Sequence, residues 1–225
     1  MEKKYDIVIF DLDGTLLDTI EDLGTAVNHA MEQGGWPLHT MEEYRRMVGH
    51  GIRNLVTQAL PQALQGDEAL IDRALASFKE YYTGHIDVHT RPYEGIPGLI
   101  RDLDAAGTMV AVASNKFQSG TETLVKRFFP DVKFLAVLGN AEGAPLKPDA
   151  AIVRSIMAKS GISSPRVVMA GDSGTDIRTA ANGGIPSIGV TWGFRPLSDL
   201  QDAGASAIAG SVSQLRSLLL GQETV

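Results

Sequence analysis

Two aspartates separated by a single residue are the most chemically informative feature of the sequence. Asp11 and Asp13 directly follow the short apolar run Ile7–Phe10, which predicts a buried β-strand. An aspartate at the tip of a strand can serve as a nucleophile, as a metal ligand, or as both. Gly14 comes next and allows a tight backbone turn. Which role applies depends on what the rest of the chain brings to these two carboxylates.

Polar residues also follow three further predicted strands, at or beyond their carboxyl ends. They are Ser114, Asn115 and Lys116 after 109–113, Lys147 in the loop beyond 133–138, and Asp172, Ser173 and Asp176 after 166–170. Ligands of open parallel sheets bind beyond the carboxyl ends of the strands. We therefore expect these side chains to lie together at one end of one sheet.

This set of residues suits phosphoryl transfer, which depends mainly on positioning and charge neutralisation. Asp11 can attack phosphorus and form an aspartyl-phosphate, while Asp13 can protonate the leaving oxygen and then deprotonate water. A divalent cation must bridge the carboxylate and the phosphate, because the two anions repel each other. Mg²⁺ prefers oxygen ligands, and Asp11 and Asp172 with one backbone carbonyl would suffice. Ser114 can hydrogen-bond phosphate oxygens, and Lys147 supplies a fixed positive charge.

The composition narrows the function classes. The net charge of -7 and the pI near 5.2 argue against a broad surface for nucleic acid or anionic membrane. The absence of cysteine excludes disulfides, thiol catalysis and thiolate metal sites. The first residues contain no long apolar run, and no stretch is long enough to span a bilayer. A cytoplasmic location is therefore expected.

Helices and strands are arranged differently in the two parts of the chain. Helices are predicted at 20–33, 41–47, 52–60 and 68–82, with Asp18 and Glu21 as a capping box for the first. Further on, strands at 109–113, 133–138, 166–170, 187–190 and 207–209 alternate with helices at 96–106, 121–129, 149–160, 176–182 and 212–220. The alternation predicts an α/β core with a Rossmann-like doubly wound parallel sheet. Residues 1–17 and 86–225 would form this core, and 18–85 an inserted all-helical cap.

Four stretches, in this order, resemble the motifs of the haloacid dehalogenase superfamily. They are Asp11-x-Asp13-Gly14-Thr15, Ser114-Asn115, Lys147-Pro148 and Gly171-Asp172-Ser173-x-x-Asp176. The resemblance covers essentially the whole chain, and the helical insert resembles the C1 cap of that superfamily. Within the superfamily the chain is most similar to phosphoglycolate phosphatases and related small-phosphate phosphatases. The stretches Val48–Gly51 and Gly189–Gly193 add to that similarity.

The resemblance implies a role for each matching residue. Asp11 would be the nucleophile and a metal ligand, and Asp13 the acid and base, with its carbonyl on the metal. Thr15, Ser114, Asn115 and Lys147 would bind phosphate, Asp172 would ligate the metal, and Asp176 would support it. The implied cofactor is Mg²⁺, and the implied partner is a small phosphorylated metabolite. Neither nucleic acid nor membrane is expected as a partner, and the protein is expected to be a monomer or a homodimer.

Two cap residues are candidates for substrate specificity. His50 and Arg53 lie around the Gly49-x-Gly51 loop that opens a predicted helix. They could meet an anionic leaving group such as a carboxylate, which arginine suits well. The competing interpretation is an exposed, solvated helix start. Asn115 and Lys116 likewise have a plain interpretation, as residues that close the start of a helix.

The predicted function is a Mg²⁺-dependent phosphatase for a small, phosphoglycolate-like monoester. A phosphosugar mutase or an inorganic pyrophosphatase of the same fold would also fit these motifs. A receiver-like module phosphorylated on aspartate, without enzymatic turnover, is a candidate from another class, but it would need neither the cap nor the second acid. Dehalogenation is disfavoured, because that branch does not need the acid at Asp13 or the metal. Cap closure would exclude water, with hinges near 16–18 and 83–92.

Overall fold

The core of the structure is one sheet of parallel strands. The computed structural model describes residues 3–162 and 166–221. Its main sheet has six strands in the order β5-β4-β1-β6-β7-β8. They are β1 (Ile7–Phe10), β4 (Met109–Phe117), β5 (Ala136–Asn140), β6 (Val167–Gly171), β7 (Ser187–Val190) and β8 (Ala207–Ala209), and each neighbouring pair is parallel. The chain proceeds outward from β1 on one side and then on the other, which confirms the doubly wound fold and places the switch point at β1.

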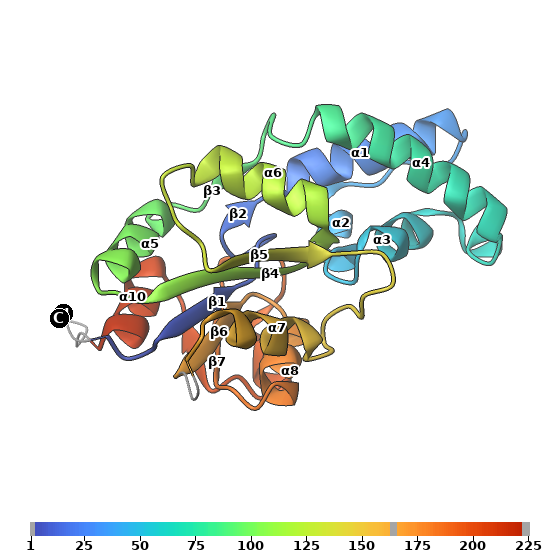
Figure 1. Ribbon diagram of the computed structural model, residues 1–225. Coiled ribbons are helices and arrows are strands. Elements are labelled where there is room, and N and C mark those ends of the chain that lie inside the picture. Colours follow the sequence, from blue (N-terminus) through green and yellow to red (C-terminus); the bar gives the residue numbers. More distant parts are fainter. Residues whose placement is uncertain (1–2, 163–165, 222–225) are drawn as a thin grey trace.

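Helices cover both faces of this sheet (Figure 1). Side chains of β1 alternate between the faces, as a strand buried on both sides requires. Val8 and Phe10 pack with the helices α5 (Ile96–Ala105), α6 (Gln118–Phe128) and α10 (Val212–Leu220). Ile7 and Ile9 pack on the other face with α7 (Ala151–Lys159) and α8 (Gly174–Asn182), and α9 (Leu197–Asp202) contacts α8. The apolar run read from the sequence therefore forms the central strand.

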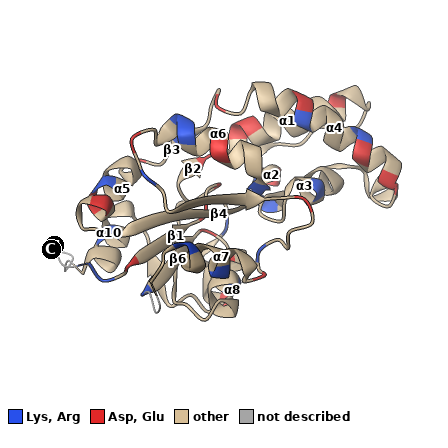
Figure 2. Ribbon diagram, in the orientation of Figure 1, with Lys and Arg blue, Asp and Glu red and all other residues tan. Residues whose placement is uncertain are grey.

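Four α-helices and one 3₁₀ turn follow the first strand. They are α1 (Ile20–Gln33), α2 (Met41–Met47), α3 (Ile52–Ala59), η1 (Gln62–Leu64) and α4 (Glu68–Gly84). Figure 1 shows α1 and α4 lying side by side beyond the sheet, with α2 and α3 below them. Acidic and basic residues are interspersed along α4 (Figure 2). The all-helical insert is thus present, and its boundaries at 17/18 and 85/86 stay a prediction.

A short two-stranded ribbon connects the helical insert to the sheet. Strands β2 (Leu17–Asp18) and β3 (Arg91–Pro92) pair in antiparallel fashion. Just above it, the buried carboxylate of Asp22 accepts hydrogen bonds from the backbone N–H of His89 at 2.9 Å, and from the N–H and hydroxyl of Thr90 at 2.8 and 2.7 Å. The returning chain is therefore bonded to α1 as far as Thr90. The hinge expected near 83–92 stays a prediction.

Several element boundaries differ from the prediction. Strand β4 continues to Phe117, and α6 begins at Gln118 instead of Thr121. The Gln118 side chain accepts a hydrogen bond from Gly139 N at 2.6 Å and donates one to Val137 O at 3.0 Å, which joins the start of α6 to β5. The sequence pattern did not reveal α9 and the ribbon β2–β3, because both are very short.

The predicted capping box of Asp18 and Glu21 was wrong. Thr19 is the N-cap residue of α1, and no side chain caps the helix there. Asp18 belongs to β2 and accepts a hydrogen bond from Ile20 N at 3.3 Å. The Thr19 hydroxyl is turned toward Asp13 instead. The Thr19 side chain, at the N-cap position of α1, therefore binds Asp13 instead of capping the helix.

Candidate active site

A cavity of about 50 Å³ lies between the carboxyl ends of the strands and the helical insert. Charged and polar side chains line it from the sheet side, and mostly apolar side chains line it from the helices. A buried water requires roughly 10–15 Å³ of such volume, so the cavity admits only a few water-sized groups. It suits a phosphoryl group with a small substituent.

Asp11 lies at the end of β1, only 8% exposed. Its Oδ1 accepts a hydrogen bond from Lys147 Nζ at 2.6 Å, whereas its Oδ2 accepts none within residues 3–162 and 166–221. Burial, together with the negative charges of Asp176 and Asp172, raises the pKa of Asp11, and Lys147 opposes this rise. One carboxylate oxygen is therefore held by the protein, and the other remains available for attack.

Lys147 connects three parts of the site. Its Nζ donates to Asp11 Oδ1 at 2.6 Å, to Asp176 Oδ1 at 2.7 Å and to the carbonyl of Ala113 at 2.9 Å. Burial lowers the pKa of Lys147, but the two carboxylates hold it above its usual value. The side chain thus remains a fixed cation with all three protons engaged.

Asp172 is enclosed by backbone on two sides. Its Oδ2 accepts a hydrogen bond from Phe194 N at 2.7 Å, and its Oδ1 accepts one from the Thr15 hydroxyl at 3.3 Å. A Cβ atom at Gly14, whose φ is +89°, would lie 2.4 Å from Asp172 Oδ2, and one at Gly193 would lie 2.2 Å from Asp172 Cβ. Both positions therefore require glycine.

The acidic residues fit a divalent cation. Asp11, Asp172 and Asp176 are buried, and each offers a carboxylate oxygen within 4.8 Å of the others. Burial and the charge of Asp176 raise the pKa of Asp172 to about 7. The raised pKa values of Asp11 and Asp172 reflect burial first and crowded negative charge second, and an oxygen-preferring cation such as Mg²⁺ would relieve the crowding.

Asp176 contributes indirectly. Its Oδ1 accepts from Lys147, and its Oδ2 accepts from Ser173 N at 3.1 Å and from the Ser173 hydroxyl at 2.6 Å. Both carboxylate oxygens therefore already bind protein donors. Both oxygens of Asp172 accept protein hydrogen bonds as well, so among these three residues only Asp11 has an oxygen without a donor in the described part of the chain. The supporting role of Asp176 stays a prediction.

Asp13 is held by two donors at one oxygen. Its Oδ1 accepts hydrogen bonds from the Thr19 hydroxyl at 2.7 Å and from Lys116 Nζ at 3.0 Å. Lys116 is buried, and although burial lowers its pKa, Asp13 holds that pKa above its usual value. The sequence pattern indicated Lys116 only as a residue at a helix start. The sequence signal that could have indicated a site role for Lys116 was its position at a strand end, two residues after Ser114.

The four predicted phosphate-binding residues are placed differently. Ser114, Asn115 and Lys147 line the cavity, and Ser114 Oγ accepts from Lys116 N at 3.1 Å, which leaves its proton free to donate. Asn115 Nδ2 donates to Gly49 O and Lys147 O at 3.0 and 3.1 Å, so its amide joins the insert to the Lys147 loop. Thr15 is buried against Asp172 and does not line the cavity. Phosphate binding by Asn115 and Thr15 stays a prediction, and their contacts favour positioning roles.

The two predicted specificity residues are not brought into the cavity. His50 is exposed, and neither it nor Arg53 is among the lining residues. Arg53 forms ion pairs with Asp72 at 2.6 Å and with Glu68, both on α4. The apolar residues Ile52, Leu55, Val56 and Ala59 recur at helical spacing on the inward face of α3, which turns Arg53 outward. That periodicity was the sequence signal against a cavity role for Arg53.

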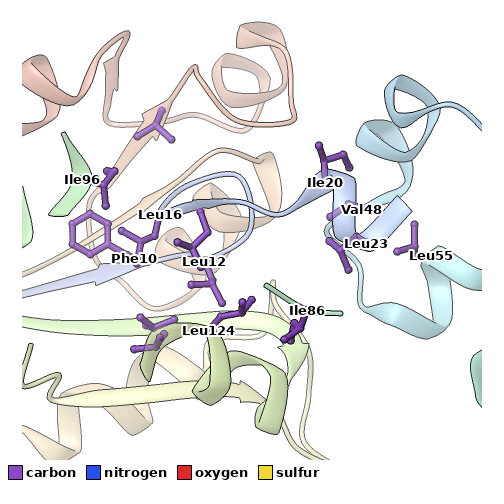
Figure 3. Packing of buried hydrophobic residues seen from close by; sticks show 14 of the residues in the cluster. Phe10, Leu12, Leu16, Ile20, Leu23, Val48, Leu55, Ile86, Ile96 and Leu124 are labelled. Atoms are coloured by element: carbon purple, nitrogen blue, oxygen red, sulfur yellow. The ribbon is translucent and has the colours of Figure 1, made fainter. Parts of the chain in front are cut away.

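Apolar residues form the cavity wall on the helical side. Leu23, Val48, Ile52 and Leu55 line it together with Gly49 and Gly51. Figure 3 shows Leu23, Val48 and Leu55 converging from separate segments, away from the cluster around Phe10 and Leu16. The part of a ligand beyond its phosphoryl group would therefore meet hydrocarbon and backbone.

Arg195 was not among the predicted site residues. It follows β7 and lines the cavity. Its Nη1 donates to the carbonyls of Arg45 and Arg46 at 3.2 and 2.6 Å, and its Nη2 donates to Val48 O at 2.5 Å. A core side chain thus binds the C-terminal carbonyls of α2. The only sequence signal was its position after a strand on the site's side of the sheet.

Comparison with known proteins identifies relatives over most of the chain. Residues 8–190 match the haloacid dehalogenase-like hydrolase family. A phosphoglycolate phosphatase of Mesorhizobium japonicum is 35% identical over 189 residues, which cover 84% of this chain and 83% of the relative. A phosphoglycolate phosphatase of Agrobacterium fabrum is 35% identical over 201 residues, covering 87% and 85%.

Solved structures agree with this assignment. A Lactobacillus delbrueckii subsp. bulgaricus protein, described provisionally as a phosphoglycolate phosphatase, superposes with a TM-score of 0.90 at 34% identity. The match covers 97% of this chain and 99% of that one. Within the described ranges, no helix combines the length and the hydropathy needed to cross a membrane.

Proposed function

This chain belongs to the haloacid dehalogenase-like hydrolase family, and from that premise we propose that it is a Mg²⁺-dependent phosphatase of small phosphomonoesters. The reaction would proceed through an aspartyl-phosphate on Asp11. One observation carries the proposal: Lys147 fixes one oxygen of the buried Asp11, no donor in the described part of the chain holds the other, and Asp11 lines a small cavity together with Ser114 and Asp172. This arrangement suits a nucleophile better than it suits a structural ion pair.

The first half-reaction transfers the phosphoryl group to the enzyme. Asp11 Oδ2 attacks phosphorus, the bond from phosphorus to the leaving oxygen breaks, and Asp13 gives its proton to that oxygen. Ser114 donates to a phosphate oxygen, and Lys147 balances the charge of the transferred group. A Mg²⁺ ion held by Asp11, Asp172 and the carbonyl of Asp13 would neutralise the phosphate charge that otherwise repels Asp11.

The second half-reaction regenerates the nucleophile. Asp13, now a carboxylate, takes a proton from water as the water oxygen attacks phosphorus. The bond between phosphorus and Asp11 then breaks, and inorganic phosphate leaves. The helical insert forms one wall of this small cavity and so limits the access of other molecules at this stage.

The size of the cavity and the relatives support a proposal for the substrate class. About 50 Å³ leaves little room beyond a phosphoryl group, so large substrates such as nucleotides would require the helical insert to move. The curated relatives named above are phosphoglycolate phosphatases. We therefore propose a two- or three-carbon phosphate ester such as phosphoglycolate as the substrate.

The test is phosphate release from a panel of esters of increasing size, including phosphoglycolate, a hexose phosphate and pyrophosphate, with and without Mg²⁺. We expect phosphate release that requires Mg²⁺ and is fastest with the smallest esters. Isomerisation of a sugar phosphate without net phosphate release would instead identify a mutase. A preference for pyrophosphate would identify a pyrophosphatase, and a stable phosphorylated Asp11 without turnover would identify a receiver-like module.

Metal binding can be tested without activity. Mg²⁺ should raise the thermal unfolding temperature, because a ligand that binds only the folded state stabilises it by mass action. Asp172→Asn should remove most of this increase, whereas Asp131→Asn, at an exposed position, should retain it. An equal Mg²⁺-induced shift in the wild type and in Asp172→Asn would contradict the proposed site.

A further inference from the structure

Lys116 is the buried cation of the site to which the reaction described above gives no task. It lies at the end of β4, and its side chain is 1% exposed. Its Nζ donates to Asp13 Oδ1 at 3.0 Å and lies 4.8 Å from the centre of the Tyr82 ring. A fully buried lysine with one carboxylate partner requires an explanation, because burying a charge is unfavourable unless the charge is well paired.

The contacts of Asp13 show what this pairing does. Oδ1 accepts from both Thr19 and Lys116, whereas no donor in the described part of the chain reaches Oδ2. Rotation about the last torsion of an aspartate is soft, so a single hydrogen bond would leave the carboxylate plane poorly defined. Two donors from different directions fix Oδ1. Since Asp13 lines the cavity, Oδ2 is the oxygen left to carry the reacting proton.

The other side of Lys116 is closed by a residue from the helical insert. Tyr82 lies in the last turns of α4, stacks on Phe78 and meets Phe117 edge-on. The ammonium faces its ring, and such cation–π contacts favour a desolvated cation. The Tyr82 hydroxyl is buried without a hydrogen-bond partner in the described part of the chain, and Tyr82 helps Asp13 to hold the pKa of Lys116 above its usual value. Lys116 is therefore held between an aromatic surface of the insert and Asp13.

We propose that Lys116 is a positioning residue for proton transfer by Asp13. It fixes Oδ1 so that the proton on Oδ2 passes to the leaving oxygen as the bond to phosphorus breaks. Lys116 keeps its own protons throughout. The ring of Tyr82 holds the ammonium in this place while the insert covers the site. The proposal rests on the phosphatase function proposed above, and it competes with a purely structural role for the ion pair.

Leaving groups distinguish the two roles. Ethyl phosphate expels an alkoxide, which needs a proton, whereas acetyl phosphate expels acetate, which does not. Both compounds, the ester ethyl phosphate and the acyl phosphate acetyl phosphate, carry a two-carbon leaving group. A misplaced acid therefore slows the first reaction selectively, and a general structural defect slows both. The quantity to compare is kcat/KM, because it reports the steps up to release of the leaving group.

The test uses Lys116→Met, which keeps the length of the side chain and removes the ammonium. We expect kcat/KM for ethyl phosphate to fall about 10²-fold, with less than a roughly 10-fold loss for acetyl phosphate. The matched control is Lys126→Met, the same change at an exposed position of α6, which should alter neither value. Asp13→Asn gives the reference for full loss of the acid. Adding Lys116→Met to Asp13→Asn should cost little more, because the two residues act as one unit.

Each outcome bears on a different statement. An equal loss on both compounds in Lys116→Met, or no loss at all, overturns the positioning role. If Lys116→Met does not fold, Lys116→Arg keeps the charge but moves the donor, and the same ratio decides. If Tyr82→Leu leaves the ratio of kcat/KM for the two compounds unchanged, Tyr82 does not hold Lys116 in place, and that part of the proposal is wrong. Failure of the wild-type enzyme to release phosphate from either compound would instead contradict the proposed function itself.

Discussion

The two walls of the cavity are built from different materials. The core side presents four carboxylates and two buried lysines, and every one of these carboxylates already accepts a hydrogen bond from the protein. The helical side presents hydrocarbon and glycine. The core therefore holds in place the charges to which the proposed mechanism assigns a task in the transition state. The wall opposite them can sort ligands only by size and shape.

Two polar contacts between the walls also differ in kind: the core contributes side chains, and the helical side contributes backbone. Asn115 and Arg195 reach across from the core, and the groups they bind are backbone carbonyls at Gly49, Arg45, Arg46 and Val48. Carbonyls are present whatever side chains a helix carries. The helical wall can therefore change its side chains, and with them the shape of the cavity, without losing these contacts to the core.

The largest effect should come from Asp11, the proposed nucleophile of the core. Asp11→Asn keeps the shape of the side chain but removes the attacking carboxylate, and we expect activity on any phosphate ester to fall by about 10⁴-fold or more. Phosphate release is the measurement, with Asp131→Asn as the exposed control. Activity near the wild-type level would exclude Asp11 as the nucleophile, and the core wall could then no longer be described as the side that carries the chemistry.

A smaller loss is expected when the two walls are separated. Arg195→Met removes three hydrogen bonds to the end of α2, and we expect kcat/KM to fall roughly 10- to 100-fold because the walls no longer align. Arg46→Met, at a side chain that is 74% exposed, is the matched control. A full-activity Arg195→Met enzyme would show that these backbone contacts do not contribute to closure.

A change in the apolar wall should alter selectivity more than rate. Ile52→Ala removes part of the wall, so esters with a longer leaving group should gain relative to the smallest ones by roughly 10-fold in kcat/KM. Val88→Ala, at an exposed valine outside the cavity, should leave the ratio unchanged. An unaltered ratio in Ile52→Ala would indicate that the helical side does not select by size.

The smallest effect is expected at Arg53. Its ion pairs with Asp72 and Glu68 lie at the surface, and such pairs contribute little to stability. Arg53→Ala should therefore change kcat/KM for phosphoglycolate less than about 2-fold, since exposed groups outside the cavity do not touch the reacting atoms. A loss comparable to that of Arg195→Met would indicate that Arg53 is, after all, a charged specificity residue on the helical side of the cavity.

Much of the core could be predicted because its signals are local. An apolar run that ends in Asp11 and Asp13 predicts a buried strand with two carboxylates at its tip, and the polar residues after the later strands narrow the role of those carboxylates. Ser114 and Asp172 follow such runs too, and parallel strands bring their carboxyl ends to one edge. Lys147 was found in the same way, because the loop that carries it starts from the end of β5.

The residues that the sequence analysis missed or misplaced are those whose role depends on the direction in which the side chain points. Lys116 and Arg195 are ordinary surface residue types, and only the packing turns one toward Asp13 and the other toward the end of α2. Arg53 has the right chemistry for a carboxylate, but the inward face of α3 is its apolar stripe.

The sequence by itself determined which polar residues follow each strand, and these residues indicate the reaction class. It could do so because the side chains of a strand alternate with a period of two residues, which fixes the direction of each one. The tertiary structure decided which side chains the helical insert presents to that chemistry. A helix can face the site with any side of its surface, and that choice is made by packing between segments far apart in the chain.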